Sequence, residues 1–364
     1  PEEALTQEEI VQLLGQLQLA NLLQFDRSNA SASLFERFTR RRKQERLAWW
    51  MGLLSIKVPL FDPDRALDRA MPLIRELFGP WGLGAYAALL LLGLKALLDR
   101  ADELFVQGQG LLAPDNLGLL YLGTILAKTV HELGHAAACK RFGGEVHKLG
   151  VMLLILAPLP YVDATASWGF RSRRERLLVG ATGVLSELAV AALAAVVWAN
   201  TAPGALHALS YNVIFVASIS TLLFNLNPLL RFDGYHMLVD VLDIPNLYQR
   251  SREQLKFLAE RWFLRLPQAQ AAAHTPAEAW WLPIYGLASL AYWLVLMSGI
   301  VFFIAKQYLD VGKLLAVVLL FTAVVWPLIQ LLRYLASSPK LAHRRTAVWA
   351  RVLGWSAVVV WVVL

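Results

Sequence analysis

The chain has 364 residues, of which 57% are hydrophobic and 17% are charged, and its formal net charge is +7. Soluble domains contain about 25% charged residues, so this composition excludes an ordinary soluble protein and indicates an integral membrane protein. Basic residues gather in the cytoplasmic loops of membrane proteins, which accounts for the positive charge without a nucleic-acid partner. The single cysteine, Cys139, excludes an internal disulfide.

The first 80 residues are predicted to form an N-terminal cytoplasmic and membrane-surface helical region, 1–80. Thr6–Glu9 matches a capping box, and apolar residues follow at helical spacing. Basic residues between Arg37 and Arg46 precede the pair Trp49 and Trp50. This pattern favours a segment lying on the membrane surface or, equally, a helix packed on the membrane spans. Prolines are expected to divide the region into short pieces, at Pro59, Pro63 and Pro72.

Beyond residue 80 the chain contains apolar runs of about 20 residues, the length of a membrane-spanning helix. We therefore expect an all-α polytopic membrane protein with about seven transmembrane helices. The expected domains are a membrane core over 81–245, a cytoplasmic loop over 246–279 and C-terminal transmembrane helices over 280–364. The expected spans cover residues 81–98, 117–141, 177–199, 205–226, 280–304, 312–336 and 346–364.

The charges of the loops orient these spans. Arginines precede the third span between Arg171 and Arg176 and follow the fourth between Arg250 and Arg265, whereas the loop 200–204 carries no charge. By the positive-inside rule, the N-terminus is cytoplasmic and the last span exits on the opposite side. Since the chain starts at Pro1 and stops inside an apolar run, we expect the native protein to extend beyond both ends.

The predicted orientation of the spans limits the structures that the apolar run 146–160 can form. Arg141 and Arg171 both lie on the inner side, so this run cannot cross the membrane once. Pro158 and Pro160 disfavour a helix. Irregular backbone at membrane depth is tolerated only where it is buried in protein or lines a wet cavity. We therefore predict a re-entrant or β-hairpin element after the second span.

A His-Glu-x-x-His sequence lies in the second span, at His131–His135. On a helix, His131 and His135 share one face and can bind one zinc ion, while Glu132 can take a proton from water. Ionisable side chains are costly inside a span, so their default interpretation is functional. Zinc is therefore the predicted cofactor. The alternative is two histidines whose hydrogen bonds are satisfied in the protein core.

A catalytic zinc ion needs a third protein ligand and an open position for water. Cys139 lies about 12 Å along the helix axis from His131 at 1.5 Å per residue, so we expect it to be a packing residue. The second and fourth spans both run inward, which brings Asp233 to the membrane depth of His135. Gly234 permits a close backbone approach, and a helix N-cap is the alternative role for Asp233. The full set of candidate third ligands is Cys139, Asp163, Glu187, Asp233 and His236.

The segment Phe224–Tyr235 reads FNLNPLLRFDGY. Together with the His-Glu-x-x-His sequence, it resembles the site-2 protease family of intramembrane zinc metalloproteases. The pattern of that family is His-Glu-x-x-His on one transmembrane helix and an Asn-Pro…Asp-Gly sequence on a later one. The resemblance covers residues 117–245.

The resemblance implies a role for each matching residue. His131, His135 and Asp233 would be the zinc ligands, and Glu132 the catalytic general base. Asn227 would help to bind substrate. In other positions the chain departs from the family. Arg231 and Phe232 stand where many members have proline before Asp-Gly, and 180–187 lacks the proline of a small-Gly-Pro-x-x-Asn pattern. These departures concern substrate handling rather than the metal ligands.

Tyr161-Val162-Asp163 and the extra C-terminal spans resemble a bacterial subgroup of this family. In that subgroup the protease carries an N-terminal PqqD-like peptide-recognition region and a C-terminal periplasmic adaptor-like region, as in secretion machinery. The resemblance implies the bacterial inner membrane, with a cytoplasmic N-terminus and a periplasmic C-terminus. The implied partners are a peptide or membrane-protein substrate, the lipid bilayer, and export or efflux components with a periplasmic adaptor region.

Further polar residues are candidates for supporting roles around the site. His236 would share a helix face with Asp233 and support it. Asp163 is a second such candidate, and Glu187, buried in a span, needs a partner such as Arg231 or a wet cavity. The remaining histidines are expected in loops or interfaces, at His147, His207, His274 and His343.

Three functions remain open on the sequence alone. The first is an intramembrane zinc metallopeptidase that cleaves a membrane-anchored protein or an exported peptide. The second is a non-catalytic or dual-role membrane subunit of an export or efflux assembly with a structural or vestigial zinc site. The third is a transporter with a carboxylate proton relay, which does not explain the spacing of the two histidines.

Overall fold

The computed structural model describes residues 55–154, 157–266, 269–337, 346 and 349–350. The capping box, the basic cluster and the tryptophan pair predicted near the N-terminus lie outside these residues, as does nearly all of the span expected at 346–364. The chain divides into two compact units, residues 1–57 with 152–158, and residues 58–151 with 159–364. The candidate site belongs entirely to the second unit.

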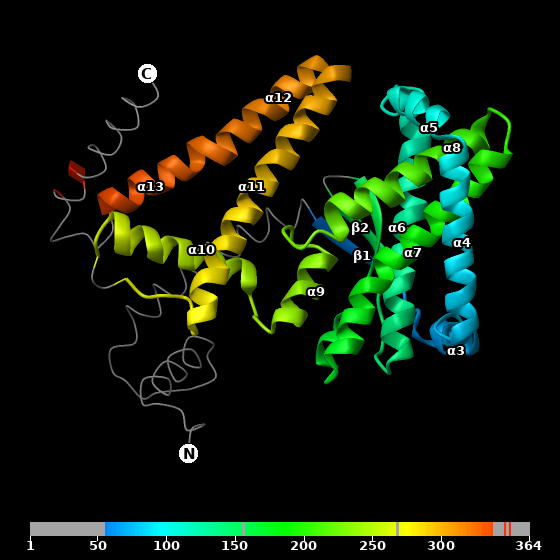
Figure 1. Ribbon diagram of the computed structural model, residues 1–364, viewed down its shortest axis with the longest axis horizontal. Coiled ribbons are helices and arrows are strands. Elements are labelled where there is room, and N and C mark those ends of the chain that lie inside the picture. Colours follow the sequence, from blue (N-terminus) through cyan, green and yellow to red (C-terminus); the bar gives the residue numbers. More distant parts are fainter. Residues whose placement is uncertain (1–54, 155–156, 267–268, 338–345, 347–348, 351–364) are drawn as a thin grey trace. The chain divides into compact units, whose positions relative to one another are not determined.

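The described part of the chain is mostly helical, as its composition predicts (Figure 1). In chain order the helices are α3 (Asp64–Leu77), α4 (Pro80–Asp99), α5 (Ala101–Gln107), α6 (Leu117–Arg141), α7 (Arg173–Asn200), α8 (Ala205–Phe215), α9 (Asp233–Leu242), α10 (Leu247–Leu258), α11 (Pro276–Gln307), α12 (Leu309–Leu320) and α13 (Trp326–Ser337). A π-helical segment, Val216–Asn225, continues α8.

The described helices include candidate membrane spans that match most of the expected apolar runs. Five are long and apolar enough to cross a membrane: Pro80–Asp99, Arg173–Asn200, Ala205–Asn225, Pro276–Gln307 and Leu309–Ser337. The chain is therefore a mostly helical protein with the helices of a membrane protein. The predicted count of seven is not confirmed. Helix α6 is not among the five, because its polar residues lower its hydropathy, and the last expected run lies almost wholly outside the described residues.

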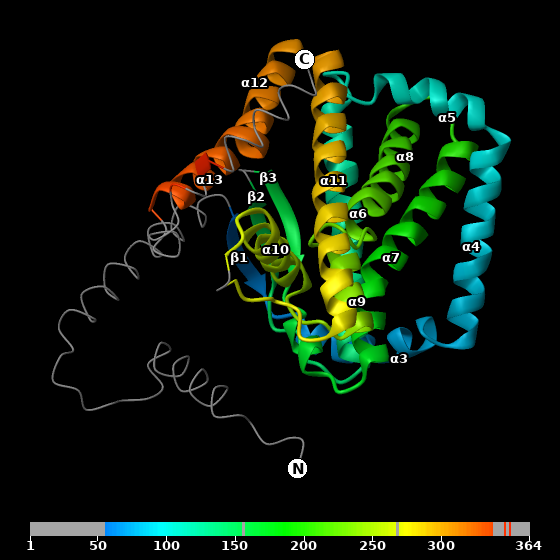
Figure 2. The same ribbon diagram turned by 60° about the vertical axis from the view of Figure 1, so that its left-hand side comes forward.

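Helix α7 is the centre of the membrane core. It packs against α4, α6, α8 and α9, and Figures 1 and 2 show these helices gathered around it. Small residues allow the close approaches: a Cβ added at Gly93 of α4 would lie 2.6 Å from the Cα of Ala192. A Cβ at Gly134 of α6 would lie 2.7 Å from the carbonyl oxygen of Thr182. Small residues at helix contacts are typical of membrane bundles.

A three-stranded sheet has the order β1-β2-β3, with β1 at Ser55–Phe61, β2 at Leu149–Leu154 and β3 at Ala157–Val162. The prolines of the sheet lie in β1 and β3, which are its edges, and the central β2 has none. Proline cannot donate to a sheet, so edge positions suit it. The run 146–160 thus forms strands rather than a helix among its described residues. Residues 155–156 are outside the description, so the hairpin itself stays a prediction.

Two N-terminal expectations are wrong. A helical region was expected throughout residues 1–80, but Ser55–Phe61 forms strand β1. The alternating β-branched residues Ile56 and Val58 favour a strand, and the backbone of β1 finds partners in β2. Pro72 was expected to break the chain, but it lies inside α3, since a helix that packs on its neighbours tolerates the loss of one hydrogen bond.

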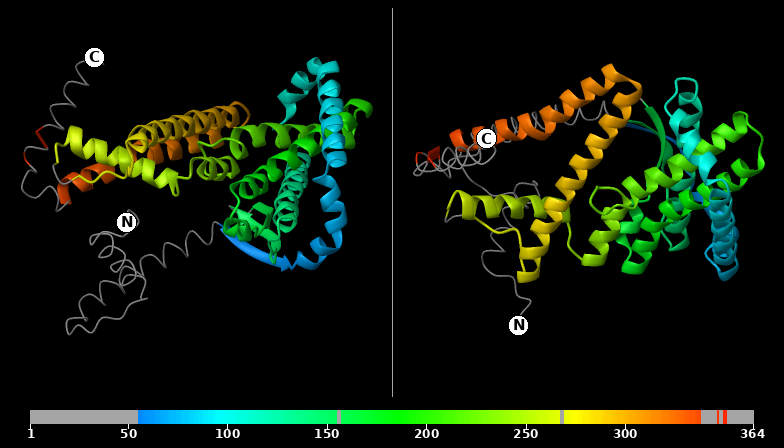
Figure 3. Two further views of the ribbon diagram at one scale, coloured as in Figure 1. Left: turned by 60° about the horizontal axis from the view of Figure 1, so that its bottom comes forward. Right: turned by 45° about the horizontal axis from the view of Figure 1, so that its top comes forward.

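Helices α11 and α12 fold back on each other at Tyr308 (Figure 3). Gly312 of α12 makes this turn tight, because a Cβ there would lie 2.3 Å from the Cβ of Ala305. Helix α11 is tied to the stretch that follows the π-helical segment. Tyr285 Oη donates to the carbonyl oxygen of Pro228 at 2.9 Å, and Ser289 Oγ donates to that of Leu229 at 2.7 Å. These bonds support the turn that leads into α9.

Candidate metal centre

Helix α6 brings the two histidines of the His-Glu-x-x-His sequence together. Their Nε2 atoms are 3.0 Å apart. Asp233, the first residue of α9, lies against both: its Oδ2 is 3.0 Å from Nε2 of His131 and 3.4 Å from Nε2 of His135. Among the described residues, these three side chains form a group that could hold a metal ion.

The spacing of this group fits the coordination of zinc. Bonds of about 2.0–2.2 Å from a tetrahedral zinc ion to nitrogen and oxygen put neighbouring ligand atoms about 3.3–3.6 Å apart. The three separations, of 3.0, 3.0 and 3.4 Å, are close to this range. The donor set of two imidazoles and one carboxylate also suits zinc.

One face of α7 supports the histidines through residues four apart, Val179, Gly183 and Glu187. Nδ1 of His135 donates to the carbonyl oxygen of Val179 at 2.7 Å. This bond leaves the lone pair of Nε2 free to bind a metal. Gly183 gives the rings room, because a Cβ there would lie 2.4 Å from Nε2 of His135. The fit of α6 on α7 therefore also orients the imidazole rings.

Glu187 occupies the far end of this stripe and is fully buried. Its Oε2 lies 3.4 Å from Nδ1 of His131. This atom of His131 is itself buried and has no hydrogen-bond partner in the described structure. The distance is within the range of an ion pair but longer than the usual 2.7–3.2 Å hydrogen bond.

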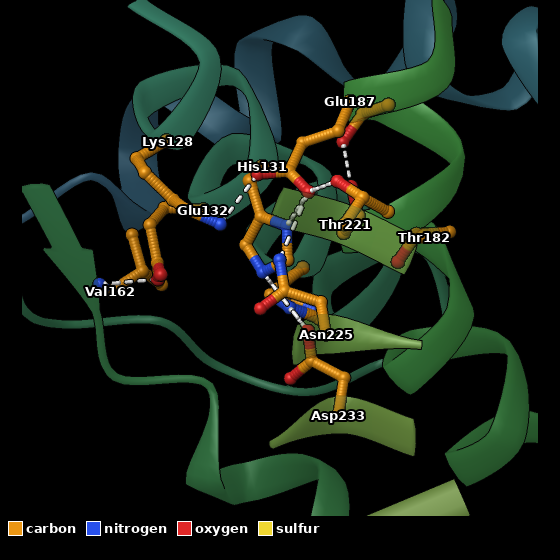
Figure 4. Close-up of polar contacts among 12 residues, drawn as sticks. Lys128, His131, Glu132, Val162, Thr182, Glu187, Thr221, Asn225 and Asp233 are labelled. Carbon is orange, nitrogen blue, oxygen red and sulfur yellow. Dashed lines mark hydrogen bonds and ion pairs between the residues drawn. The ribbon is translucent and has the colours of Figure 1, made fainter. Parts of the chain in front are cut away.

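Three donors surround the Glu187 carboxylate (Figure 4). Nζ of Lys128, on α6, donates to Oε1 at 2.7 Å. Oγ1 of Thr221 and Nδ2 of Asn225 donate to Oε2, the latter at 3.0 Å. Arg231 or a wet cavity was expected to accommodate Glu187; the partners are instead these three side chains, and Arg231 is not among them. The guanidinium of Arg231 lies instead over the ring of Tyr248, at 5.6 Å.

Glu132 is oriented by strand β3 rather than by a helix. The backbone N–H of Val162 donates to its Oε2 at 2.9 Å, and Figure 4 shows this contact on the side of His131 away from Glu187. The bond fixes one carboxylate oxygen and leaves Oε1 as the oxygen that can exchange a proton. A glutamate next to a metal ligand, with one oxygen in use, has the arrangement of a general base.

Asp233 is delivered by a tight turn after the π-helical segment. A Cβ at Gly234 would lie 2.3 Å from the carbonyl oxygen of Leu226, so the close backbone approach expected at this glycine is confirmed. The π-helical segment also turns Thr221 and Asn225 to the same side, toward Glu187. Such segments are frequent at functional sites.

Other predicted residues make contacts of their own. Asn227 makes a local turn, with its Oδ1 accepting from the N–H of Leu229 at 2.8 Å. The carboxylate of Asp163 accepts from the hydroxyl of Thr165 at 2.7 Å. His236 is exposed, and its ring lies 6.1 Å from that of Trp168 with no hydrogen bond to Asp233 in the described structure. Cys139 is fully buried in an apolar cluster, as expected.

Lys128, Thr221 and Asn225 were not predicted from the sequence as partners of Glu187. Lys128 precedes His131 by three residues, so both lie on one face of the same helix, and a lysine in an apolar run is itself a signal. Thr221 and Asn225 are polar residues four apart in an apolar run. Each could have been found by asking which polar residues inside the spans can face Glu187.

Comparisons with known proteins add nothing to this geometry: no family model, no curated protein and no solved structure matches the chain. What the chain does must therefore be argued from its own residues.

Proposed function

We propose that the chain is a membrane-embedded zinc metallopeptidase. The observation that carries the proposal is the meeting of His131, His135 and Asp233, from helices far apart in sequence, next to a glutamate. A backbone N–H holds one oxygen of that glutamate, and the described residues show no hydrogen bond to the other. Three protein ligands suit a catalytic zinc, whereas structural zinc sites use four. The sequence resemblance to site-2 proteases supports the same reaction.

His131, His135 and Asp233 would hold the metal, which when bound supplies a Lewis acid for a peptide carbonyl and for water. Glu132 takes a proton from the attacking water on Oε1 and returns it to the leaving amine. Val162 keeps Oε2 engaged throughout, so that the proton moves at one oxygen. The carboxylate of Asp233 would also neutralise part of the positive charge of the metal.

The substrate class follows from the surroundings of Glu132. Strand β3 is an edge of the sheet, and its Val162 end contacts the proposed base. An extended peptide can pair with an edge strand through its main chain, and it must be extended because a helix hides its carbonyl groups. Peptide segments of membrane-anchored or exported proteins are therefore the proposed substrates, with the bacterial inner membrane as the proposed location and export components as the proposed partners.

The test is a Glu132→Gln variant expressed in cells, with membrane and secreted peptides compared by mass spectrometry. We expect uncut substrates to accumulate, because glutamine cannot take the proton, while the bound zinc content of the purified protein is unchanged. Loss of a general base typically lowers the rate about 10²–10⁴-fold.

A matched control is Glu175→Gln, the same chemical change at a partly exposed residue of α7, which should leave the peptide pattern unchanged. If Glu132→Gln accumulates nothing and the cells still export normally, the peptidase proposal fails. A non-catalytic zinc subunit of an export assembly would then be the better description. A purified protein without zinc would reject both.

A further inference from the structure

Glu187 and Lys128 form a largely buried ion pair that the proposed reaction does not use. Glu187 is fully buried, and the side chain of Lys128 is 21% exposed. Burying two charges costs several kcal/mol, which their attraction seldom repays in full. Replacement of such a pair by apolar residues is often neutral or stabilising, so the pair calls for an explanation beyond stability.

The geometry points to Glu187 as the positioning residue of His131, an inference that rests on the proposed function. When Nε2 of an imidazole binds a metal, its proton sits on Nδ1. Metal-binding histidines almost always donate that proton to a carboxylate, a carbonyl or water. His135 already does so through Val179. His131 has a buried Nδ1 without a hydrogen bond, and Glu187 Oε2 lies 3.4 Å from it.

The other contacts of Glu187 fix the carboxylate in this place. Thr221 and Asn225 hold Oε2 from the π-helical segment, and Lys128 holds Oε1 from α6. A ring shift of a few tenths of an ångström brings Nδ1 of His131 into hydrogen-bond range.

Charge balance explains why the carboxylate comes with a lysine. Zinc carries two positive charges, and Asp233 and Glu132 supply two negative ones, so the filled site is already neutral. Glu187 adds a further negative charge, and Lys128 cancels it. Glu187 can thus polarise the imidazole of His131 without leaving a net charge in a low-dielectric region.

The test measures zinc affinity of the purified full chain by competition with a chelator, in the absence of substrate. Glu187→Gln keeps the shape of the side chain but removes its charge and should raise the zinc Kd about 10–100-fold. Its amide would also face the ammonium of Lys128, so Glu187→Gln is paired with the double variant Lys128→Met/Glu187→Gln. Measured without metal, the double variant should unfold at the same midpoint temperature as the wild type, yet it should still bind zinc weakly. A purely structural role of Glu187 would instead restore stability and zinc affinity together.

Glu175→Gln, elsewhere on α7, is the matched control and should bind zinc like the wild type. Wild-type affinity in either Glu187 variant would overturn the positioning role. If only the double variant regained affinity, Glu187 would matter through charge balance alone. A weakened affinity together with a wild type that cleaves no peptide would reject the proposed function and leave the positioning role standing. A wild type that binds no zinc would overturn both.

Discussion

At the scale of single residues, the space around the histidines is set by Gly183. Alanine there would carry a Cβ 2.4 Å from Nε2 of His135 and 2.6 Å from Cε1 of His131. Real Cβ contacts are not this short, so the imidazole rings must leave the positions in which they lie beside Asp233. We expect Gly183→Ala to weaken zinc binding by about 10–100-fold, the range seen when the support of a ligand is lost. Chelator competition measures the change.

The control for this prediction is Gly118→Ala on α6, where an added Cβ meets nothing within 4 Å. Both substitutions raise helix propensity by about 1 kcal/mol, so a general effect on helix stability would be similar in the two variants. Wild-type zinc affinity in Gly183→Ala would contradict the tight packing of α6 on α7.

The grouping of His131, His135 and Asp233 could be predicted from the sequence, because the spacing of the histidines along a helix is fixed. His131 and His135 had to share a helix face, and Asp233 was selected by membrane depth. The partners of Glu187 could not be found in this way, because they depend on which face of each helix turns inward. The π-helical segment shifts that face for Thr221 and Asn225, and nothing in its composition distinguishes it from an ordinary helix.

At the scale of elements, Asp64 links the start of α3 to the end of α6. Its Oδ2 accepts from Nζ of Lys140 at 2.8 Å, and its Oδ1 accepts from the N–H of Val146 at 3.0 Å. Asp64→Asn should destabilise the protein by about 1–3 kcal/mol, the value of hydrogen bonds to a charged group. The readout is the thermal unfolding midpoint in detergent at neutral pH.

Asp68→Asn is the matched control. Asp68 also lies 2.9 Å from Nζ of Lys140, but its side chain is 59% exposed, so its loss should cost less than about 1 kcal/mol. Equal effects of the two variants would contradict a specific role for Asp64.

The contribution of Asp64 to the stability of the protein should depend on pH. The hydrogen bond from Lys140, followed by that from Val146, holds the pKa of Asp64 below its ordinary value of 3.8. Because the pKa of Asp64 is lower in the folded state, its contribution to stability is fully present above the unfolded pKa of 3.8. The contribution is lost as the pH falls through the lower pKa of the folded state. The difference in midpoint between wild type and Asp64→Asn should therefore shrink below pH 3.8 and stay constant between pH 5 and 7.

Elements were predicted well where apolar runs are long. Helices α4, α7 and α11 each begin and end within a few residues of an expected span. Strand β1 was missed because its pairing partner β2 lies far along the chain, and short apolar runs do not distinguish strand from helix. Pro59 of β1 was interpreted as a break, although proline also suits the edge strand of a sheet.

At the scale of the whole molecule, the candidate spans differ in how many of their residues are buried in the protein. In the most apolar 18-residue stretch of Arg173–Asn200 and of Ala205–Asn225, 44% of the residues are buried. In that of Leu309–Ser337, 0% are buried. Spans that carry the site are thus packed more deeply in protein, and the last described span leaves most of its apolar side chains open to lipid or to another protein. Such a surface is stable only in a membrane or in an assembly.

The orientation of α7 can be tested with single cysteines, since Cys139 is the only one in the chain. In a Cys139→Ala background, cysteine is introduced at Gly169, before α7, or at Ala202, after it; both residues are exposed. The arginines near the start of α7 predict that this end is cytoplasmic. A membrane-impermeant maleimide should therefore label Ala202→Cys in intact cells, and Gly169→Cys only after permeabilisation. Labelling of both from outside would mean that α7 does not cross the membrane, and the reverse pattern would invert the predicted orientation.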